Sequence, residues 1–273
     1  MQQSQSLGKS VQVGTETILD FDRVGLEYIV DGKPRRIIDE ITLDIKKGEF
    51  VSFVGPSGCG KTSILRMVSG LAPAPIGEVR YRGSKITKPL KNVGIAFQSP
   101  VLMPWRNILG NVMLPLEIVQ PYKREFKTRK IDFIQMAEEL LQTVGLQDFK
   151  KQFPWQLSGG MRQRASLCRA LIHQPEILLL DEPFGALDPF TREEMWVMLQ
   201  DLWKRVGCTC ILITHDLREA VFLSDTVYVM APRPSSILYK LKIELPHPTT
   251  IEMTLSDEFN HLVTDLRRHI HRN

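Results

Sequence analysis

The chain has 273 residues, 43% hydrophobic and 24% charged, a balance that suits one large globular domain or two closely packed ones. Its formal net charge of +4 is too small to indicate nucleic-acid binding, which normally concentrates basic residues on one face. No apolar run approaches the roughly 20 residues of a membrane span, and residues 1–16 lack the apolar stretch of a secretory signal. We therefore expect a cytoplasmic protein with no nucleic-acid partner, whose membrane spans, if any are needed, come from another chain.

The first part of the chain shows strand patterns separated by turns. β-Branched and aromatic residues mark strands at residues 18–30 and 41–54, and residues 31–34 between them have the composition of a turn. The apolar strand at residues 50–54 stops at a glycine, and a helical pattern follows. This helix carries its apolar side chains at Ile64, Leu65 and Val68.

From about residue 98 to residue 165 the pattern is helical with proline breaks. One helix ends at Gly145, which can cap it; its apolar positions are Phe133, Ala137, Leu140, Leu141 and Val144. Four consecutive apolar residues at 177–180 then fit a strand buried on both faces of a parallel sheet. Further buried strands are expected at 210–214 and 227–230. A helical stripe before them is expected to pack in the core, at Met195, Met198, Leu199, Leu202, Trp203 and Val206.

The last residues form a distinct extension. Prolines break up a linker, at Pro232, Pro234, Pro246 and Pro248. A final helix is expected to begin at Ser256 as N-cap, with acidic residues in its first turn. Strands that alternate with helices predict an α/β fold with a mainly parallel sheet. We divide the chain into three parts. A polar tail comprises residues 1–17, and the extension comprises residues 231–273. Between them lies a large domain whose core, at residues 18–97 and 166–230, is interrupted by a helical subdomain at about 98–165.

The four cysteines indicate no disulfide framework in a chain of this length. Cys208 and Cys210 lie two positions apart in an expected strand, so both side chains point to one face. No further ligand has the spacing of a metal site. We therefore expect these two cysteines to pack in the core.

Residues 55–62 match the phosphate-binding loop pattern, with a strand before and a helix after. The glycines let the backbone wrap and point N–H groups at phosphates, and the helix N-terminus adds partial positive charge. Lys61 would place a cation on the β- and γ-phosphates, and the Thr62 hydroxyl would ligate Mg²⁺. Cys59 is expected to contribute its backbone, although its side chain could also face the nucleotide. The candidate nucleotide-binding residues are Gly55, Pro56, Ser57, Gly58, Cys59, Gly60, Lys61, Thr62 and Ser63.

The apolar strand at 177–180 ends in Asp181 and Glu182. Two carboxylates at the end of a buried strand need a compensating charge, which Mg²⁺ would supply. We expect Asp181 to hold the metal and Glu182 to polarise the attacking water as general base. The plainer reading is a pair of acids that cap the following helix.

A second anion site is indicated by a signature segment at the start of another expected helix. Its residues are Leu157, Ser158, Gly159, Gly160 and Met161. One nucleotide does not need two such sites from one chain. The presence of two anion sites in one chain is explained if two chains share each nucleotide.

The phosphate-binding loop, the signature segment, the acidic pair and a single histidine after the next strand occur in this order. The ordered set resembles the nucleotide-binding domain of ABC transporters over residues 18–230. The resemblance implies a P-loop NTPase (RecA-like) core with a mainly parallel sheet, an antiparallel β part near the N-terminus and an inserted helical subdomain. It also implies ATP hydrolysis with ATP and Mg²⁺ as cofactors.

The resemblance assigns further roles. Tyr28 resembles the aromatic residue that stacks on adenine, and Gln98 the glutamine that contacts Mg²⁺ and the attacking water. His215 resembles the switch histidine that contacts the γ-phosphate. The signature segment would face the γ-phosphate held by a second copy of the chain. The loop that crosses the dimer seam would be Ala186, Leu187 and Asp188.

Met161 stands where the wider family often has glutamine, and Gln163 follows two residues later. This form, together with residues 102–105, 114–117 and 181–188, is similar to importers of the nitrate, sulfonate and taurine type. The similarity implies a transmembrane permease, an extracytoplasmic solute-binding protein and a place on the inner face of the cell membrane. The candidate permease contact is Met103, Pro104, Trp105 and Arg106. Its alternative is a tryptophan packed within the subdomain.

Other classes stay open. An exporter subunit is disfavoured only by the resemblance of residues 161–164 and 102–105 to importers. A soluble ABC ATPase of DNA repair or translation usually has paired modules or long inserted arms, which this chain lacks. A regulatory protein with an inactive site would not need the complete set of catalytic residue types. The solute is open among nitrate, sulfonates, taurine, bicarbonate and small pyrimidines.

Overall fold

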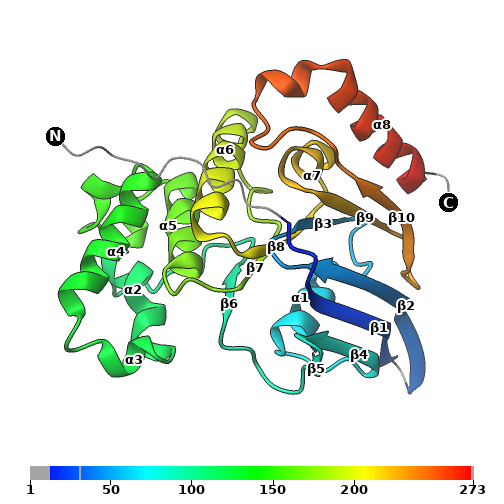
Figure 1. Cartoon of the computed structure of the whole chain (residues 1–273), viewed down its shortest axis with the longest axis horizontal. Coiled ribbons are helices and arrows are strands. Elements are labelled where there is room, and N and C mark those ends of the chain that lie inside the picture. The colour runs from blue at the N-terminus through cyan, green and yellow to red at the C-terminus, as the bar shows by residue number, and fades with distance from the viewer. Residues whose placement is uncertain (1–12, 31, 272–273) are drawn as a thin grey trace.

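Two β-sheets form the centre of the structure, a computed structural model that describes residues 13–30 and 32–271 (Figure 1). The first sheet is antiparallel, with strand order β2-β1-β4-β5. It consists of β1 (Thr17–Val30), β2 (Lys33–Lys46), β4 (Ile76–Tyr81) and β5 (Ser84–Lys85). The second has the order β10-β9-β3-β8-β7-β6, parallel except for β10. It consists of β3 (Phe50–Val54), β6 (Val93–Ala96), β7 (Ile177–Asp181), β8 (Thr209–Thr214), β9 (Thr226–Met230) and β10 (Ile237–Lys242).

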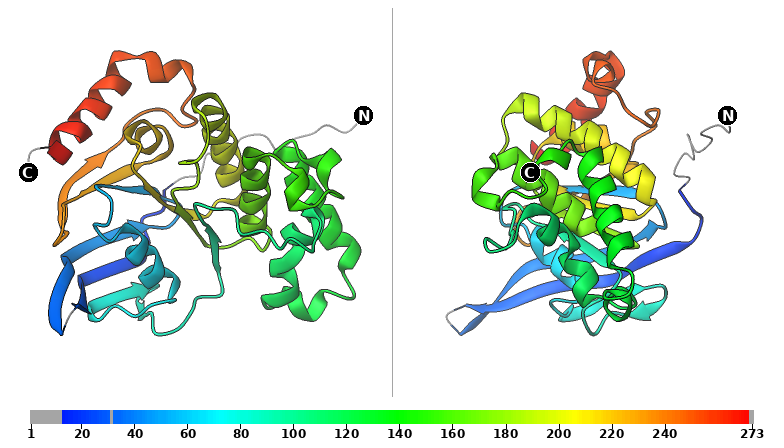
Figure 2. Two further views of the ribbon diagram at one scale, coloured as in Figure 1. Left: turned by 180° about the vertical axis from the view of Figure 1, so that it is seen from behind. Right: turned by 90° about the vertical axis from the view of Figure 1, so that its left-hand side faces the viewer.

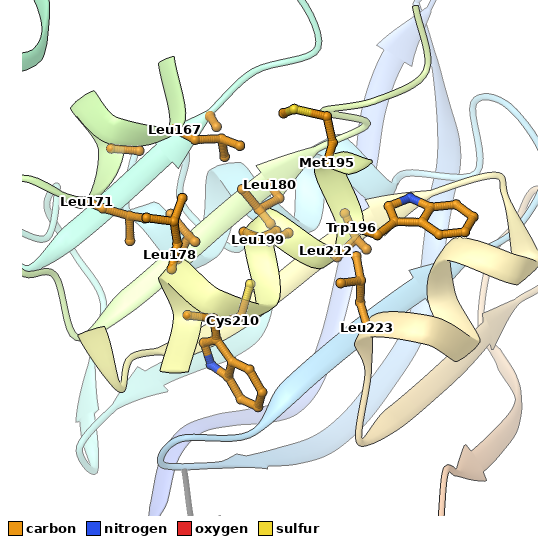
Figure 3. Close-up of a cluster of buried hydrophobic side chains, with 14 of the residues drawn as sticks. Leu167, Leu171, Leu178, Leu180, Met195, Trp196, Leu199, Cys210, Leu212 and Leu223 are labelled. Carbon is orange, nitrogen blue, oxygen red and sulfur yellow. The ribbon is translucent and has the colours of Figure 1, made fainter. Parts of the chain in front are cut away.

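The central parallel strands are buried on both faces, as their uninterrupted apolar runs predict. Along β7, Ile177 and Leu179 face a core shared with α1 (Lys61–Ser69) and the antiparallel sheet. Leu178 and Leu180 face a second core on the opposite side. Figure 3 shows the second core, where β7 and β8 meet two helices. These helices are α5 (Gly159–Leu171) and α6 (Pro189–Val206).

The inserted region between β6 and β7 is helical, as predicted. It lies at the end of the molecule away from the antiparallel sheet (Figures 1 and 2). Its first part consists of α2 (Ile108–Ile118), α3 (Tyr122–Glu125) and α4 (Lys130–Thr143). Short 3-10 helices at Gln147–Phe149 and Pro154–Gln156 lead into α5. Gly145 adopts a φ of 69° just after α4, which confirms the predicted glycine cap.

The C-terminal region adds α7 (Leu217–Leu223), a 3-10 helix (Glu252–Leu255) and α8 (Asp257–His271). The Ser256 hydroxyl accepts a hydrogen bond from the Phe259 N–H at 3.2 Å, which confirms the predicted N-cap. The expected linker contains β10, which the sequence analysis did not predict. Residues 237–239 and 241 are half-buried, whereas Lys240 and Lys242 are exposed, as expected for an edge strand paired with β9.

A second difference concerns the start of β2. It begins at Lys33, not near residue 41, because its polar first half pairs with β1 in an exposed hairpin in which Tyr28 lies opposite Arg35. The expected turn thus shortens to the residues around Gly32, and Asp31 lies outside the described residues. Residues 1–12 of the expected tail and residues 272–273 of the extension lie outside them as well.

All four cysteines are free and buried, so the prediction of core packing for Cys208 and Cys210 is confirmed. Burial raises the pKa of the Cys208 thiol to about 12. Among the residues that the structure describes, no helix combines the length and apolar composition needed to cross a membrane.

Candidate active site

The candidate functional residues gather where the parallel strands end. The phosphate-binding loop at residues 55–60 follows β3, Gln98 follows β6, and His215 follows β8. Asp181 ends β7, and Glu182 comes next. Ligands in open parallel sheets bind at the carboxyl ends of the strands, so the fold places these residues at the edge where a ligand is expected.

The phosphate-binding loop is shaped by its glycines and closes around Lys61. Gly60 has a φ of 104°, and an added Cβ would lie 2.8 Å from Cγ1 of Ile38, so the loop requires glycine there. Lys61 is 6% exposed, and its ammonium donates hydrogen bonds to the carbonyls of Gly55 at 2.9 Å and Pro56 at 3.0 Å. The cation is therefore held inside the loop by backbone acceptors that a phosphate can replace.

The Cys59 side chain is enclosed by the protein, with Sγ 3.4 Å from a Cβ added to Gly55 of the loop. It is fully buried in the core with α1 and the antiparallel sheet, so the interpretation that its thiol faces a nucleotide is wrong. Cys59 can contribute only its backbone to the loop.

Asp181 and Thr62 form the candidate metal site. The Thr62 hydroxyl donates a hydrogen bond to Asp181 Oδ1 at 3.1 Å. Burial raises the pKa of Asp181, and the Thr62 hydrogen bond opposes this. A bound cation would offset the cost of burying the carboxylate. Hydroxyl and carboxylate oxygens side by side are ligands that Mg²⁺ prefers, so these residues fit the ion.

Glu182 lies between Gln98 and His215. Its carboxylate Oε2 is 3.4 Å from the Gln98 amide nitrogen and 3.3 Å from Nδ1 of His215. Its φ of 45° is unusual for a residue with a side chain, and its backbone N–H donates to the Ile213 carbonyl. Strain of this kind gathers at functional sites, and here it aims a partly exposed carboxylate at two polar side chains.

A pocket of about 410 Å³ lies over the phosphate-binding loop, which we call the loop pocket. It is lined by Tyr28, Arg35, Ile37, Ser57, Gly58, Gly60, Lys61, Thr62, Ser63, Glu182 and Arg233. Tyr28 is half exposed on the pocket wall, where an aromatic face can meet a base.

Arg35 and Arg233 are pocket residues that the sequence analysis missed. The Arg233 guanidinium donates to the Gly58 carbonyl, on the outer side of the loop. Arg233 follows β9, and the ends of the other parallel strands already carried candidate site residues. Its position in the sequence could therefore have identified it. Arg35 lies in the first half of β2, between the expected turn at residues 31–34 and the expected strand that began at residue 41.

The signature segment forms a second pocket of about 420 Å³, which we call the signature pocket. It is lined by Ser158, Gly159, Gly160, Met161, Arg164, Ala186, Leu187, Asp188 and Thr191. Ser158 is the N-cap of α5 and accepts a hydrogen bond from the Met161 N–H at 3.3 Å. Open space surrounds Gly159, so the N-terminus of α5 is free to receive an anion. The signature pocket and the loop pocket share no residue.

These features agree with what comparison with known proteins finds. The family model for ABC transporters matches residues 38–185. The taurine import ATP-binding protein TauB of Escherichia coli K12 is 40% identical over 212 residues, which cover 78% of this chain and 80% of that protein. The chain belongs to the ABC transporter family. As a member of this family it binds and hydrolyses ATP.

Further relatives agree with this assignment. TauB of Shigella flexneri is 39% identical over the same shares of the two chains. Two solved structures of the ABC transporter cassette MJ0796 superpose with TM-scores of 0.70 and 0.67 at 29% identity, covering 84% of this chain and all of theirs. Both are dimeric, and the second is a post-hydrolysis state bound to ADP and Pi. The predicted ABC ATPase fold is thereby confirmed.

The loop at residues 103–106 of this ABC ATPase presents an aromatic side chain to solvent. Trp105 is 72% exposed, so it is not packed within the subdomain. Arg106 forms an ion pair with Glu117 at 2.6 Å, and the Met103 N–H donates to the Asn111 side chain at 2.7 Å. The loop is therefore fixed on α2 while its tryptophan stays free to meet another surface.

Proposed function

We propose that this chain is the ATP-hydrolysing subunit of an ABC importer, and that two copies clamp two ATP·Mg²⁺ between them. The observation that carries the proposal is the division of the phosphate-binding groups into two separate pockets. In an antiparallel pair, the loop pocket of each copy would face the signature pocket of the other. The dimeric state of the MJ0796 structures supports this arrangement.

In each composite site, the backbone N–H groups of residues 58–62 and Lys61 would hold the phosphates. Thr62 and Asp181 would hold Mg²⁺, which neutralises charge on the phosphate oxygens. Glu182 would accept a proton from the attacking water, with Gln98 and His215 orienting the water and the γ-phosphate. Loss of the γ-phosphate removes a contact that bridges the two copies, and the clamp reopens.

We propose that the clamp drives a transmembrane permease on the inner face of the cell membrane. The exposed Trp105 loop would contact the permease, as an aromatic anchor of the kind that dominates interface energetics. Similarity to taurine import ATP-binding proteins supports a small sulfonate as the solute. An extracytoplasmic binding protein and the permease would select it.

Affinity purification of the chain from its native membranes, followed by mass spectrometry, tests the transport assignment. A multi-span permease is expected to co-purify. Recovery of soluble nucleic-acid or ribosomal partners alone would contradict transport and leave ATP hydrolysis standing. Proteoliposomes holding the permease and binding protein would then show whether taurine stimulates ATP hydrolysis more than nitrate or bicarbonate does. Equal stimulation by all three would contradict the sulfonate class.

A further inference from the structure

Arg192, in the first turn of α6, lies between two loops of the site. One guanidinium nitrogen is 3.0 Å from Oδ2 of Asp216, the residue after the switch histidine. The other terminal nitrogen donates to the Leu187 carbonyl at 3.0 Å. Leu187 belongs to the loop at residues 186–188 that lines the signature pocket. A single side chain thus joins the loop that carries His215 to a wall of the other pocket.

Both partners of Arg192 are fixed in place. Asp216 Oδ1 accepts hydrogen bonds from the N–H groups of Arg218 at 2.9 Å and Glu219 at 3.3 Å, so it caps α7. On the other side, Asp188 accepts a hydrogen bond from the Thr191 N–H at 3.1 Å. Each of the two loops next to Arg192 is thus anchored by hydrogen bonds of its own.

Thr191 also contacts the signature segment. An added Cβ on Gly160 would lie 3.2 Å from the Thr191 methyl group. The start of α5, the start of α6 and the loop between β7 and α6 therefore form one packed unit. Arg192 joins this unit to the loop after β8.

The pair of Arg192 with Asp216 is not an ordinary surface ion pair. The two side chains are 24% and 23% exposed. The Arg192 Nε is buried and has no hydrogen-bond partner among the described residues. The guanidinium is held by its two terminal nitrogens, which reach Asp216 and the Leu187 carbonyl. Its planar fork can hold two acceptors in different directions, which a lysine ammonium on a flexible stem does less well.

We propose that Arg192 is a positioning residue that couples the two ATP sites of the dimer. The inference rests on the proposed clamp, in which His215 contacts the nucleotide of its own chain and residues 186–188 face that of the other copy. Occupancy of one site shifts the loop of His215, and Arg192 carries that shift to the wall of the opposite site. Its contribution is to the coupling between sites, not to the affinity of either one.

The test compares Arg192→Ala and Arg192→Lys with Arg205→Ala, which removes an arginine from the last turn of the same helix, where it contacts Thr143. Rates of ATP hydrolysis are measured against ATP concentration, and folding is followed by thermal melting. Both Arg192 variants should show a Hill coefficient near 1, as expected when a coupling of about tenfold between the two sites is lost. The half-saturating ATP concentration should rise by only about threefold, the square root of a tenfold coupling, because no ATP contact is removed. Arg205→Ala should behave as the wild type does.

Arg192→Lys keeps the positive charge, so the proposal can still be tested with this variant when Arg192→Ala folds poorly. Asp216→Asn keeps a cap acceptor and weakens the pair, so combining it with Arg192→Ala should add little further loss. A wild-type Hill coefficient of 1 would overturn the proposal, as would Arg192 variants with unchanged cooperativity or with losses that only follow the folded fraction. Failure of a Glu182→Gln chain to dimerise with ATP would contradict the clamp itself, which is a different result.

Discussion

Replacing Glu219 by glutamine should remove one large pH-dependent contribution to this protein's stability between pH 5 and pH 7.5. Glu219 lies in α7 and is 3% exposed. Its Oε2 accepts a hydrogen bond from the Thr214 hydroxyl, and its Oε1 has no partner among the described residues. Burial raises the pKa of Glu219 to about 8; the Thr214 hydrogen bond opposes the rise, and the charge of Asp216 adds to it.

The sign follows from the two pKa values. Between the unfolded value of 4.5 and the folded value of about 8, the folded carboxyl holds a proton that the unfolded one has lost. The unfolded state binds fewer protons, so stability falls as pH rises through this window and levels off above it. At about 1.4 kcal/mol per pH unit, the loss from pH 5 to pH 7.5 is roughly 3 kcal/mol.

Urea unfolding of wild type and Glu219→Gln at a series of pH values measures the effect. The glutamine has no proton to lose, so the variant should gain roughly 3 kcal/mol on the wild type between pH 5 and pH 7.5. The glutamine amide adds an unsatisfied buried donor, which lowers the free energy of unfolding by the same amount at every pH. This cost therefore does not affect the change in stability with pH. Glu258→Gln, at an exposed carboxylate in α8, is the matched control and should show no such gain. A stability difference that stays constant with pH in Glu219→Gln would refute the reasoning.

Four other substitutions test the site. Glu182→Gln should bind ATP, hydrolyse it about 10² to 10⁴ times more slowly and elute as a dimer with ATP; full activity would remove Glu182 as the base. Lys61→Ala should lose nucleotide affinity in a titration, and unchanged binding would defeat its role. Arg233 lines the loop pocket, so we expect its guanidinium to donate one hydrogen bond to a nucleotide phosphate. Arg233→Ala should then raise the KM for ATP by about tenfold, and an unaltered KM would exclude a contact between Arg233 and phosphate. Trp105→Glu should keep basal ATP hydrolysis in proteoliposomes but lose transport, and normal transport would show that this tryptophan is not the permease contact.

Much of the site could be predicted because its elements are local in sequence. A phosphate-binding loop is a short run of residues whose backbone does the binding, so its composition alone identifies it. Asp181 and Glu182 were visible because an apolar strand ends in charge. Arg233 and Arg192 were not, since their roles depend on which distant backbone carbonyl they reach. No sequence spacing encodes that distance.

Two of the missed segments share a physical cause. β10 and the first half of β2 lie at sheet edges, so one long side of each meets solvent and polar residues are tolerated. β4, β5 and β6 were also unpredicted, and β6 is only four residues long and contains Gly94, whose added Cβ would meet the Ala170 carbonyl. Strands in the centre of the parallel sheet are apolar on both faces, and these were found.

The separation of the two pockets follows from the layers of the fold. The helix after the phosphate-binding loop, α1, packs in the core with the antiparallel sheet, whereas α5 packs in the core on the other face of the parallel sheet (Figure 1). Their N-termini therefore approach phosphates from different layers, and no rearrangement of loops brings them to one nucleotide. Moving α5 across would expose Leu167, Leu171 and their neighbours, each at about 1.5 to 3 kcal/mol. In the proposed clamp a second copy would supply the other N-terminus with both cores intact, so the layers of one chain are compatible with a shared site.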